Sequence, residues 1–219
     1  MFCVIIGVIV GGRLGYVLFY GEGYYFQHPE QILAFNKGGM SFHGGLIGAL
    51  LAGIAAAKLT RIPYLTLADL GSIAAPIGLF FGRCANFVNG ELWGAPTDAA
   101  WGVVFGGAAG TMPRHPSQLY EAFLEGVVIF AVLYLLSRRM PPRPRGTFLG
   151  TFLVMYGCFR FLVEFVREPD AQLGYLWGGW LTMGQLLSVP LILVGAGVLV
   201  YALVVKKPQK GLPEMKQSE

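Results

Sequence analysis

Long apolar stretches separated by short polar connections run along almost the whole chain. A helix needs roughly 20 apolar residues to cross a bilayer, and the pattern predicts about six such spans. We place them near residues 1–20, 44–57, 66–82, 118–137, 146–166 and 184–205. The sequence therefore predicts an all-α integral membrane protein, a bundle of about six transmembrane helices forming a single domain over residues 1–219.

The composition agrees with a lipid environment. Hydrophobic residues make up 55% of the chain and charged residues 13%, which is more apolar surface than a water-soluble domain of this size can bury. The 32 glycines would weaken helices in water, but they let helices approach closely in lipid. The net charge of +4 is small, and no basic run is interleaved with aromatic residues. We therefore expect membrane lipids and no nucleic acid as partners.

Basic residues mark one side of the predicted bundle, because positively charged connections stay in the cytoplasm. Most of the 16 Lys and Arg residues lie in one set of alternate connections and after the last span. They are Lys58, Arg61, Arg138, Arg139, Arg143, Arg145, Lys206, Lys207, Lys210 and Lys216. Both termini are therefore predicted to be cytoplasmic, with residues 206–219 as a tail and the polar region 83–117 facing outward.

The fifth predicted span carries ionisable residues, which are costly at membrane depth and usually have a partner or a function. Tyr156, Arg160, Glu164 and Arg167 are spaced by four, four and three residues, so they share one helical face. An ion pair of Arg160 with Glu164 that only joins helices is one interpretation. Arg167 lies one turn nearer the outside and favours an anion site, because guanidinium groups donate in a planar fork to phosphate oxygens.

A second polar group begins where the third predicted span ends. Arg83 alone could be an anchor at the membrane surface, but Asn86, Asn89 and Glu91 follow closely. Amide groups can both donate to and accept from hydroxyl groups, and a carboxylate can orient an arginine. The segment therefore predicts a pocket for a polar lipid headgroup.

Candidates for a base, a nucleophile and a metal ligand are few. His43 is bracketed by glycines that allow a ligand to approach closely, although a lone histidine is often structural. Cys84 beside Arg83 could be a reactive thiol, but packing is the favoured interpretation. Neither HExxH nor a paired-cysteine ligand set occurs, so we expect no metal ion and no cofactor. No GxSxG or SxxK nucleophile signature occurs either, so in an enzyme the nucleophile would come with the substrate.

Five motifs then point to a known family. They are SFHGG at 41–45, GRCANFVNGELWG at 82–94, RHPSQLYE at 114–121, FRFLVEFVREPDAQ at 159–172 and MGQLLSVP at 183–190. In this order, and over nearly the whole chain, they resemble the prolipoprotein diacylglyceryl transferase family. The second motif is the most specific, because it resembles the family signature GRxxNFxNGExxG.

The resemblance implies an enzyme of the bacterial cytoplasmic (inner) membrane with its active site toward the outer, periplasmic side. It would transfer the sn-1,2-diacylglyceryl group from phosphatidylglycerol to the lipobox cysteine thiol in the signal peptide of a prolipoprotein. The products would be a thioether and glycerol 1-phosphate. The family has seven spans with the amino terminus outside, so we expect this chain to lack the family's amino-terminal first span.

This activity suggests roles for the candidate residues. We expect Arg83 and Arg160 to clamp the phosphate on which negative charge grows, and His43 to act as the base for the thiol. The expected substrate-binding residues are Asn86, Asn89, Glu91, Gly94, Tyr156, Glu164 and Arg167. Among them, the polar residues after Arg83 would hold the glycerol head, Glu164 would orient Arg160, and Arg167 would assist at the headgroup or control access.

Two other classes stay open at this point. A transporter could use intramembrane Arg and Glu pairs, although no paired broken helices or inverted repeats are visible in the sequence. A non-catalytic phospholipid-binding membrane protein could use the same phosphate pocket, but would not need a base beside it. Only the enzyme would give a diacylglyceryl adduct on a lipobox peptide.

Overall fold

A computed structural model describes residues 2–19, 24–34, 38–138, 143–168, 176 and 181–209. Regular structure in this part is helical, apart from three isolated antiparallel bridges. Among the described residues, five helical segments are long and apolar enough to cross a membrane, and a shorter apolar helical stretch, Gly44–Thr60, accompanies them. The predicted all-α integral membrane class is confirmed.

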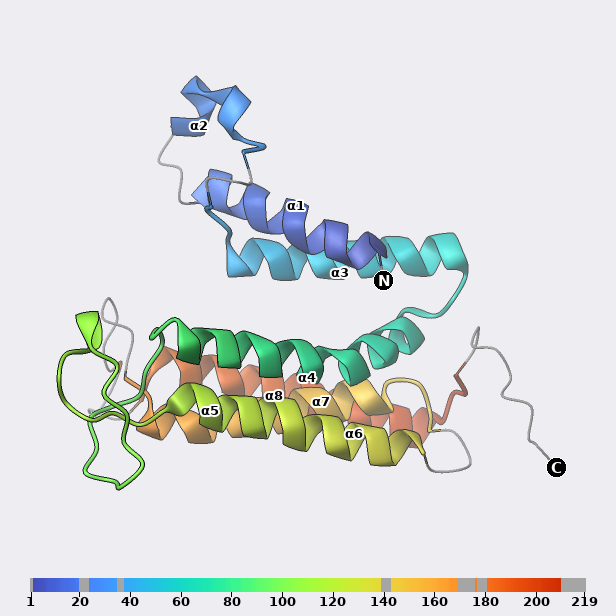
Figure 1. The fold of residues 1–219 in the computed structure, drawn as a ribbon. Helices are drawn as coiled ribbons and strands as arrows, with labels where there is room; N and C mark the ends of the chain where they lie inside the picture. The colour runs from blue at the N-terminus through green and yellow to red at the C-terminus, as the bar shows by residue number, and fades with distance from the viewer. Residues whose placement is uncertain are drawn as a thin grey trace. The chain divides into compact units, whose positions relative to one another are not determined.

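The chain divides into two compact units, each described here by itself. Unit 1 contains the described residues up to Ala68, and unit 2 contains residues 69–209. Helix α4 (Tyr64–Val88) begins in the first unit and continues into the second (Figure 1). The expectation of a single membrane domain stays a prediction.

Unit 1 is built on the packing of α1 (Phe2–Phe19) against α3 (Phe42–Thr60), which lie along each other (Figure 1). Glycines line the contact. A methyl group added to Gly15 would come within 2.7 Å of the Gly44 Cα atom. Close backbone approach between small residues is how helices associate in lipid, where hydrophobic burial no longer drives association.

Arg13 organises the connection from α1 to α3, which includes α2 (Tyr24–Gln27) and the turn η1 (Pro29–Gln31). Its side chain is buried. Its guanidinium donates to the carbonyl oxygens of Gln31 at 2.7 Å, Ile32 at 2.7 Å and Gly38 at 2.5 Å. This arginine therefore fixes the segment that leads to the start of α3.

Unit 2 is a bundle of four long helical segments that run side by side (Figure 1). The first is α4, which continues to Val88 and so carries Arg83 and Asn86 beyond the predicted span end at residue 82. The second segment consists of α5 (Ser117–Glu121), the π-helical segment η4 (Ala122–Val128) and α6 (Ile129–Ser137) in succession. The third is α7 (Thr147–Val163), followed by the turn η5 (Glu164–Val166). The fourth is α8 (Met183–Val205).

Packing inside unit 2 combines an apolar core with a glycine contact. Ile129, Leu133 and Phe148 form the buried centre. Helices α7 and α8 meet at Gly150, where an added methyl group would come within 2.8 Å of the Leu199 backbone nitrogen. This close approach holds α7, which carries Arg160, in place against α8.

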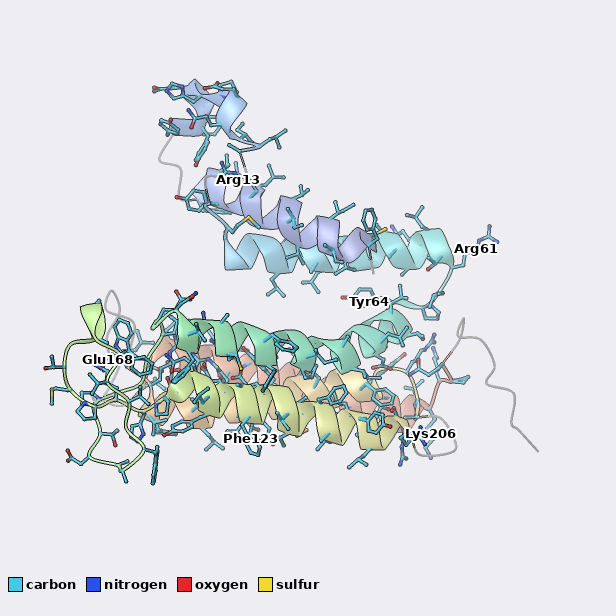
Figure 2. All side chains as sticks on the ribbon, in the orientation of Figure 1. Arg13, Arg61, Tyr64, Phe123, Glu168 and Lys206 are labelled. Carbon is cyan, nitrogen blue, oxygen red and sulfur yellow. The ribbon has the colours of Figure 1, made fainter. Side chains whose placement is uncertain are left out.

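Asp69 joins three segments at one end of unit 2. Its buried carboxylate accepts from the backbone nitrogens of Gly146 at 2.6 Å and Leu149 at 2.8 Å, and from the Gln209 amide at 2.7 Å. It thereby satisfies free N–H groups in the first turn of α7 and ties the segment after α8 to α4. Figure 2 labels Lys206 at this end and Glu168 at the opposite end of unit 2.

Candidate functional site

Three arginines of unit 2 converge on one carboxylate near the end that carries Glu168. Arg83 comes from α4, Arg160 from α7, and Arg167 directly follows η5. Together with the buried glutamates they form what we call the arginine–glutamate cluster. Its members are Arg83, Arg160, Arg167, Glu121, Glu125 and Glu164.

Glu121 is the centre of this cluster. Its side chain is 0% exposed, and its Oε2 atom lies 3.1 Å from the Arg83 Nε atom. Its Oε1 atom lies 3.2 Å from the Arg160 Nη1 atom and 3.3 Å from the Arg167 Nη1 atom. One carboxylate thus holds together three guanidinium groups that would otherwise repel one another.

Two further glutamate side chains lie in the cluster, so that three arginines face three glutamates. The Glu164 Oε2 atom lies 2.5 Å from the Arg160 Nη1 atom, and the Glu164 Oε1 atom accepts a hydrogen bond from the Thr182 hydroxyl at 2.8 Å. The Oε2 atom of the fully buried Glu125 lies 3.6 Å from the Arg83 Nη2 atom. The contact of Arg160 with Glu164 that the sequence predicts is present, while its part in catalysis stays a prediction.

The segment that carries Glu125 is π-helical. Such turns interrupt α-helices mostly at functional sites, because they change the direction of nearby side chains. Gly126 follows Glu125 and lets this segment approach α4, since an added methyl group would come within 2.7 Å of the Phe80 Cβ atom. The local helix geometry and one glycine therefore bring Glu125 near Arg83.

The polar residues after Arg83 also gather as the sequence predicts. The amide groups of Asn86 and Asn89 both donate to the Glu91 Oε1 atom, at 2.8 Å and 3.3 Å. These hydrogen bonds, that of Asn86 foremost, lower the pKa of the Glu91 carboxyl below its ordinary value. Glu91 is exposed, so the group presents an ionised carboxylate and two amides at the surface of unit 2.

Gly94 joins the polar loop to the arginine segment through its backbone. It forms an antiparallel bridge with Arg167, and its nitrogen donates to the His115 carbonyl at 2.9 Å. An added methyl group would come within 2.5 Å of the His115 carbonyl oxygen and 2.6 Å of the Val166 carbonyl oxygen. Glycine is therefore required here for close packing, and the expected contact of Gly94 with substrate stays a prediction.

Arg114, which was not among the predicted site residues, holds the same loop through hydrogen bonds. Its Nη1 atom donates to the Glu168 carboxylate at 2.7 Å and to the Gly94 carbonyl at 3.2 Å. Its Nε atom donates to the Ala109 carbonyl at 2.9 Å. Since Glu168 follows Arg167, this contact restrains the segment that carries the third arginine.

Two further predicted residues can be located on their helices. Tyr156 lies on α7 one turn before Arg160 and stacks on Phe152, with ring centroids 5.8 Å apart. Its expected part in substrate binding stays a prediction. His43 has its backbone in the first turn of α3 in unit 1. Its side chain lies outside the described residues, and its role as a base stays a prediction.

Sequence reasoning missed Glu121 and Glu125. Both lie in the apolar stretch 118–137, four residues apart. Arg160 and Glu164 were singled out because a charged residue inside a predicted span usually has a partner or a function. Glu125 meets the same criterion, and this was the signal by which it could have been found. Glu121 stands at the edge of that span, where a charge is less unusual.

Comparison with known proteins agrees with the family resemblance. A family model described as prolipoprotein diacylglyceryl transferase matches residues 1–201. Three similar proteins, each named phosphatidylglycerol–prolipoprotein diacylglyceryl transferase, come from Geobacter sulfurreducens, Nitratidesulfovibrio vulgaris strain DP4 and Azotobacter vinelandii. They are 54%, 53% and 54% identical over 96%, 90% and 92% of this chain. The alignments cover 78%, 73% and 76% of these relatives.

Proposed function

The chain belongs to the prolipoprotein diacylglyceryl transferase family, and on that premise we propose that it acts at the lipobox cysteine of prolipoproteins. It transfers the sn-1,2-diacylglyceryl group of phosphatidylglycerol to the cysteine thiol, forms a thioether and releases glycerol 1-phosphate. The observation that carries this proposal is the meeting of three arginines around buried Glu121.

The chemistry requires stabilisation of a leaving phosphate. The cysteine sulfur forms a bond to an sp³ carbon of the diacylglycerol while the bond from that carbon to the phosphate oxygen breaks. Negative charge therefore grows on the phosphate, and donors held in place beforehand stabilise it. Arg83 and Arg160 are the proposed clamp, and Arg167 assists them.

The clamp keeps donors available although Glu121 already binds the arginines. Within the described part of the chain, Arg160 and Arg167 contact carboxylates through their Nη1 atoms. Among the described residues, no ion pair involves the Nη2 atoms of these two side chains, and each Nη2 atom carries two N–H donors. A phosphodiester can accept from these donors while Glu121 keeps the guanidinium groups together.

The thiol and the lipid headgroup need further residues. A cysteine thiol has a pKa of about 8.5 and is mostly protonated at neutral pH, so a base must take its proton, and His43 is our candidate. Asn86, Asn89 and Glu91 would bind the glycerol hydroxyls of the headgroup, since their amide and carboxylate atoms both donate and accept.

We place the arginine–glutamate cluster toward the outer side of the bacterial inner membrane. Lys206 and Glu168 lie at opposite ends of unit 2 (Figure 2). Arg143 and Arg145 precede α7 at the Lys206 end, where the Arg145 nitrogen donates to the Lys207 carbonyl at 3.0 Å. Because basic residues accumulate on the cytoplasmic side, the end with the cluster would face outward.

The test is an assay with purified protein, phosphatidylglycerol and a lipobox peptide, scored for a diacylglyceryl mass shift. Arg83→Ala and Arg160→Ala should each lower kcat about 100- to 1,000-fold, as loss of one preorganised donor does. Arg138→Ala is the matched control, because Arg138 is an exposed arginine after α6 at the other end of unit 2. Unchanged turnover in either cluster variant contradicts the clamp.

The same assay separates the alternatives. Binding of phosphatidylglycerol without a peptide adduct would indicate a non-catalytic lipid-binding protein. Movement of the lipid across vesicle membranes without an adduct would indicate a transporter. For the base, full transfer by His43→Gln at neutral pH would remove His43 from that role.

A further inference from the structure

A short segment of the loop between α4 and α5, residues 101–105, is held at both ends by aromatic side chains. The Trp101 Nε1 atom donates to the Tyr120 hydroxyl at 2.7 Å. The Phe105 ring meets the Phe87 ring edge to face, with ring centroids 5.6 Å apart. Because Tyr120 belongs to α5 and Phe87 to α4, the segment is fixed between two helices at the end of unit 2 where this loop lies (Figure 1).

Both helices hold the segment close to the arginine–glutamate cluster. Tyr120 directly precedes Glu121, the residue that contacts all three arginines. Phe87 follows Arg83 by four residues, which is about one turn or 6 Å along α4. The residues between the two aromatic contacts therefore lie beside the end of unit 2 where the proposed chemistry takes place.

The middle of the segment has one paired and one open backbone edge. Val103 forms an antiparallel bridge with Arg114, in which each backbone nitrogen donates to the other residue's carbonyl at 2.9 Å. Successive residues of an extended chain direct their N–H and C=O groups to opposite sides, so those of Val104 face away from Arg114. Among the described residues neither group of Val104 has a hydrogen-bond partner, and Val104 is 55% exposed.

A free donor beside a free acceptor on exposed backbone is the pattern to which another extended chain can add. We propose that Val104 pairs with the prolipoprotein chain just after the lipobox cysteine and so positions the thiol at the arginine–glutamate cluster. The inference rests on the proposed function. In a signal peptide the apolar segment precedes the processing site. The residues after the cysteine therefore continue outside the membrane, on the side where we place this loop.

The free groups of Val104 fit a peptide better than the phosphate or the acyl chains of the lipid. A phosphodiester accepts hydrogen bonds but has no donor for the Val104 carbonyl, and acyl chains have neither donors nor acceptors. Pairing through the backbone also leaves the side chains after the cysteine free to vary. An extended chain advances about 3.3 Å per residue, so the paired residue would follow the cysteine by only a few positions.

The first experiment removes the Val104 N–H with Val104→Pro. The backbone φ of Val104 is not positive, and Val103 before it is already extended, as proline prefers. In the lipobox-peptide assay we expect kcat/KM for the peptide to fall about 5- to 10-fold, as loss of one backbone hydrogen bond does. The KM for phosphatidylglycerol should stay as in the unaltered protein.

Thr111→Pro is the matched control. Thr111 is an exposed residue of the same loop with no positive φ, and its N–H has no partner among the described residues. Its kcat/KM for the peptide should not change. An unchanged kcat/KM in Val104→Pro, with thermal unfolding as in the unaltered protein, overturns the proposal. A raised KM for phosphatidylglycerol with an unchanged KM for the peptide also overturns it, because the glycerol headgroup would then occupy the edge.

The second experiment alters the peptide and uses the unaltered protein, so it does not depend on the folding of a variant. Each amide after the lipobox cysteine is replaced in turn by an ester, which lacks the N–H. We expect the ester that faces the Val104 carbonyl to lower kcat/KM about 5- to 10-fold, and the esters on either side of it to have no effect, because adjacent N–H groups point in opposite directions. Equal effects at all positions, or none at any, contradict backbone pairing.

Photolabelling separates failure of the edge from failure of the proposed function. The probe is a lipobox peptide with serine in place of the cysteine and a photoreactive residue shortly after it. It should label the protein within residues 101–105. Labelling there, without an adduct on the cysteine peptide, would support the edge and contradict the transferase. Adduct formation on the cysteine peptide with labelling only elsewhere would contradict the edge.

Discussion

Glu121 offers the sharpest test of how the arginines are held. Replacement by Ala removes a carboxylate that contacts all three of Arg83, Arg160 and Arg167 at 3.1 to 3.3 Å. Glu121 is 0% exposed, and removal of one partner of a buried ion pair costs about 3–5 kcal/mol, because the remaining charges are left uncompensated. We therefore expect Glu121→Ala to lower the free energy of unfolding by about this amount.

The variant Glu121→Gln distinguishes the effect of the negative charge of Glu121 from the effect of its side-chain shape. The amide fills the same space but no longer neutralises the three guanidinium groups or competes with phosphate for them. We expect kcat to fall about 100-fold, because the arginines lose their fixed positions. We expect the KM for phosphatidylglycerol to fall as well, because an internal anion has been removed. A side chain that only supports folding would not lower both parameters.

The assays are chemical unfolding in detergent micelles and the lipobox-peptide assay with varied phosphatidylglycerol. For the unfolding assay the matched control is Glu168→Gln, which removes a 44% exposed carboxylate paired with Arg114, and exposed pairs contribute only about 0–1 kcal/mol. Stability within about 1 kcal/mol of the unaltered protein in Glu121→Ala, or an unchanged kcat in Glu121→Gln, would refute the reasoning.

Three further predictions concern other parts of the protein. Asp69→Ala should lower the free energy of unfolding by about 3 kcal/mol in the same unfolding assay, because buried N–H groups of α7 lose a charged acceptor. Gly126→Ala should cost about 1–3 kcal/mol there, since the new methyl group would lie 2.7 Å from the Phe80 Cβ atom. Asn86→Ala should raise the pKa of Glu91 toward its ordinary value of 4.5. The stability that the lowered pKa provides is present above that value and is lost as the pH falls through the lowered one. A pH series of thermal unfolding should therefore show a smaller loss of stability below about pH 4.5 in Asn86→Ala than in the unaltered protein, because less of this stability is present to be lost. Equal losses in the two proteins would contradict this.

Several features of the site could be predicted because they depend on spacing along one helix. Arg160 and Glu164 are four residues apart, and in the structure the Arg160 Nη1 atom lies 2.5 Å from the Glu164 Oε2 atom. Asn86 and Glu91 lie close together in the chain and are hydrogen-bonded. Glu121 could not be assigned in this way, because its partners lie on other helices and no local pattern states which helices pack together.

The amino-acid sequence by itself determined the membrane class, the family and the residues that share one helical face. These follow from local composition, from motifs and from the helical repeat, all of which can be counted along the chain. Only the tertiary structure decided that Glu121 joins three arginines and that Gly94 lies against two carbonyl groups. Each of these depends on segments far apart in the chain coming within a few ångströms, and close helix packing, not spacing in sequence, sets those distances.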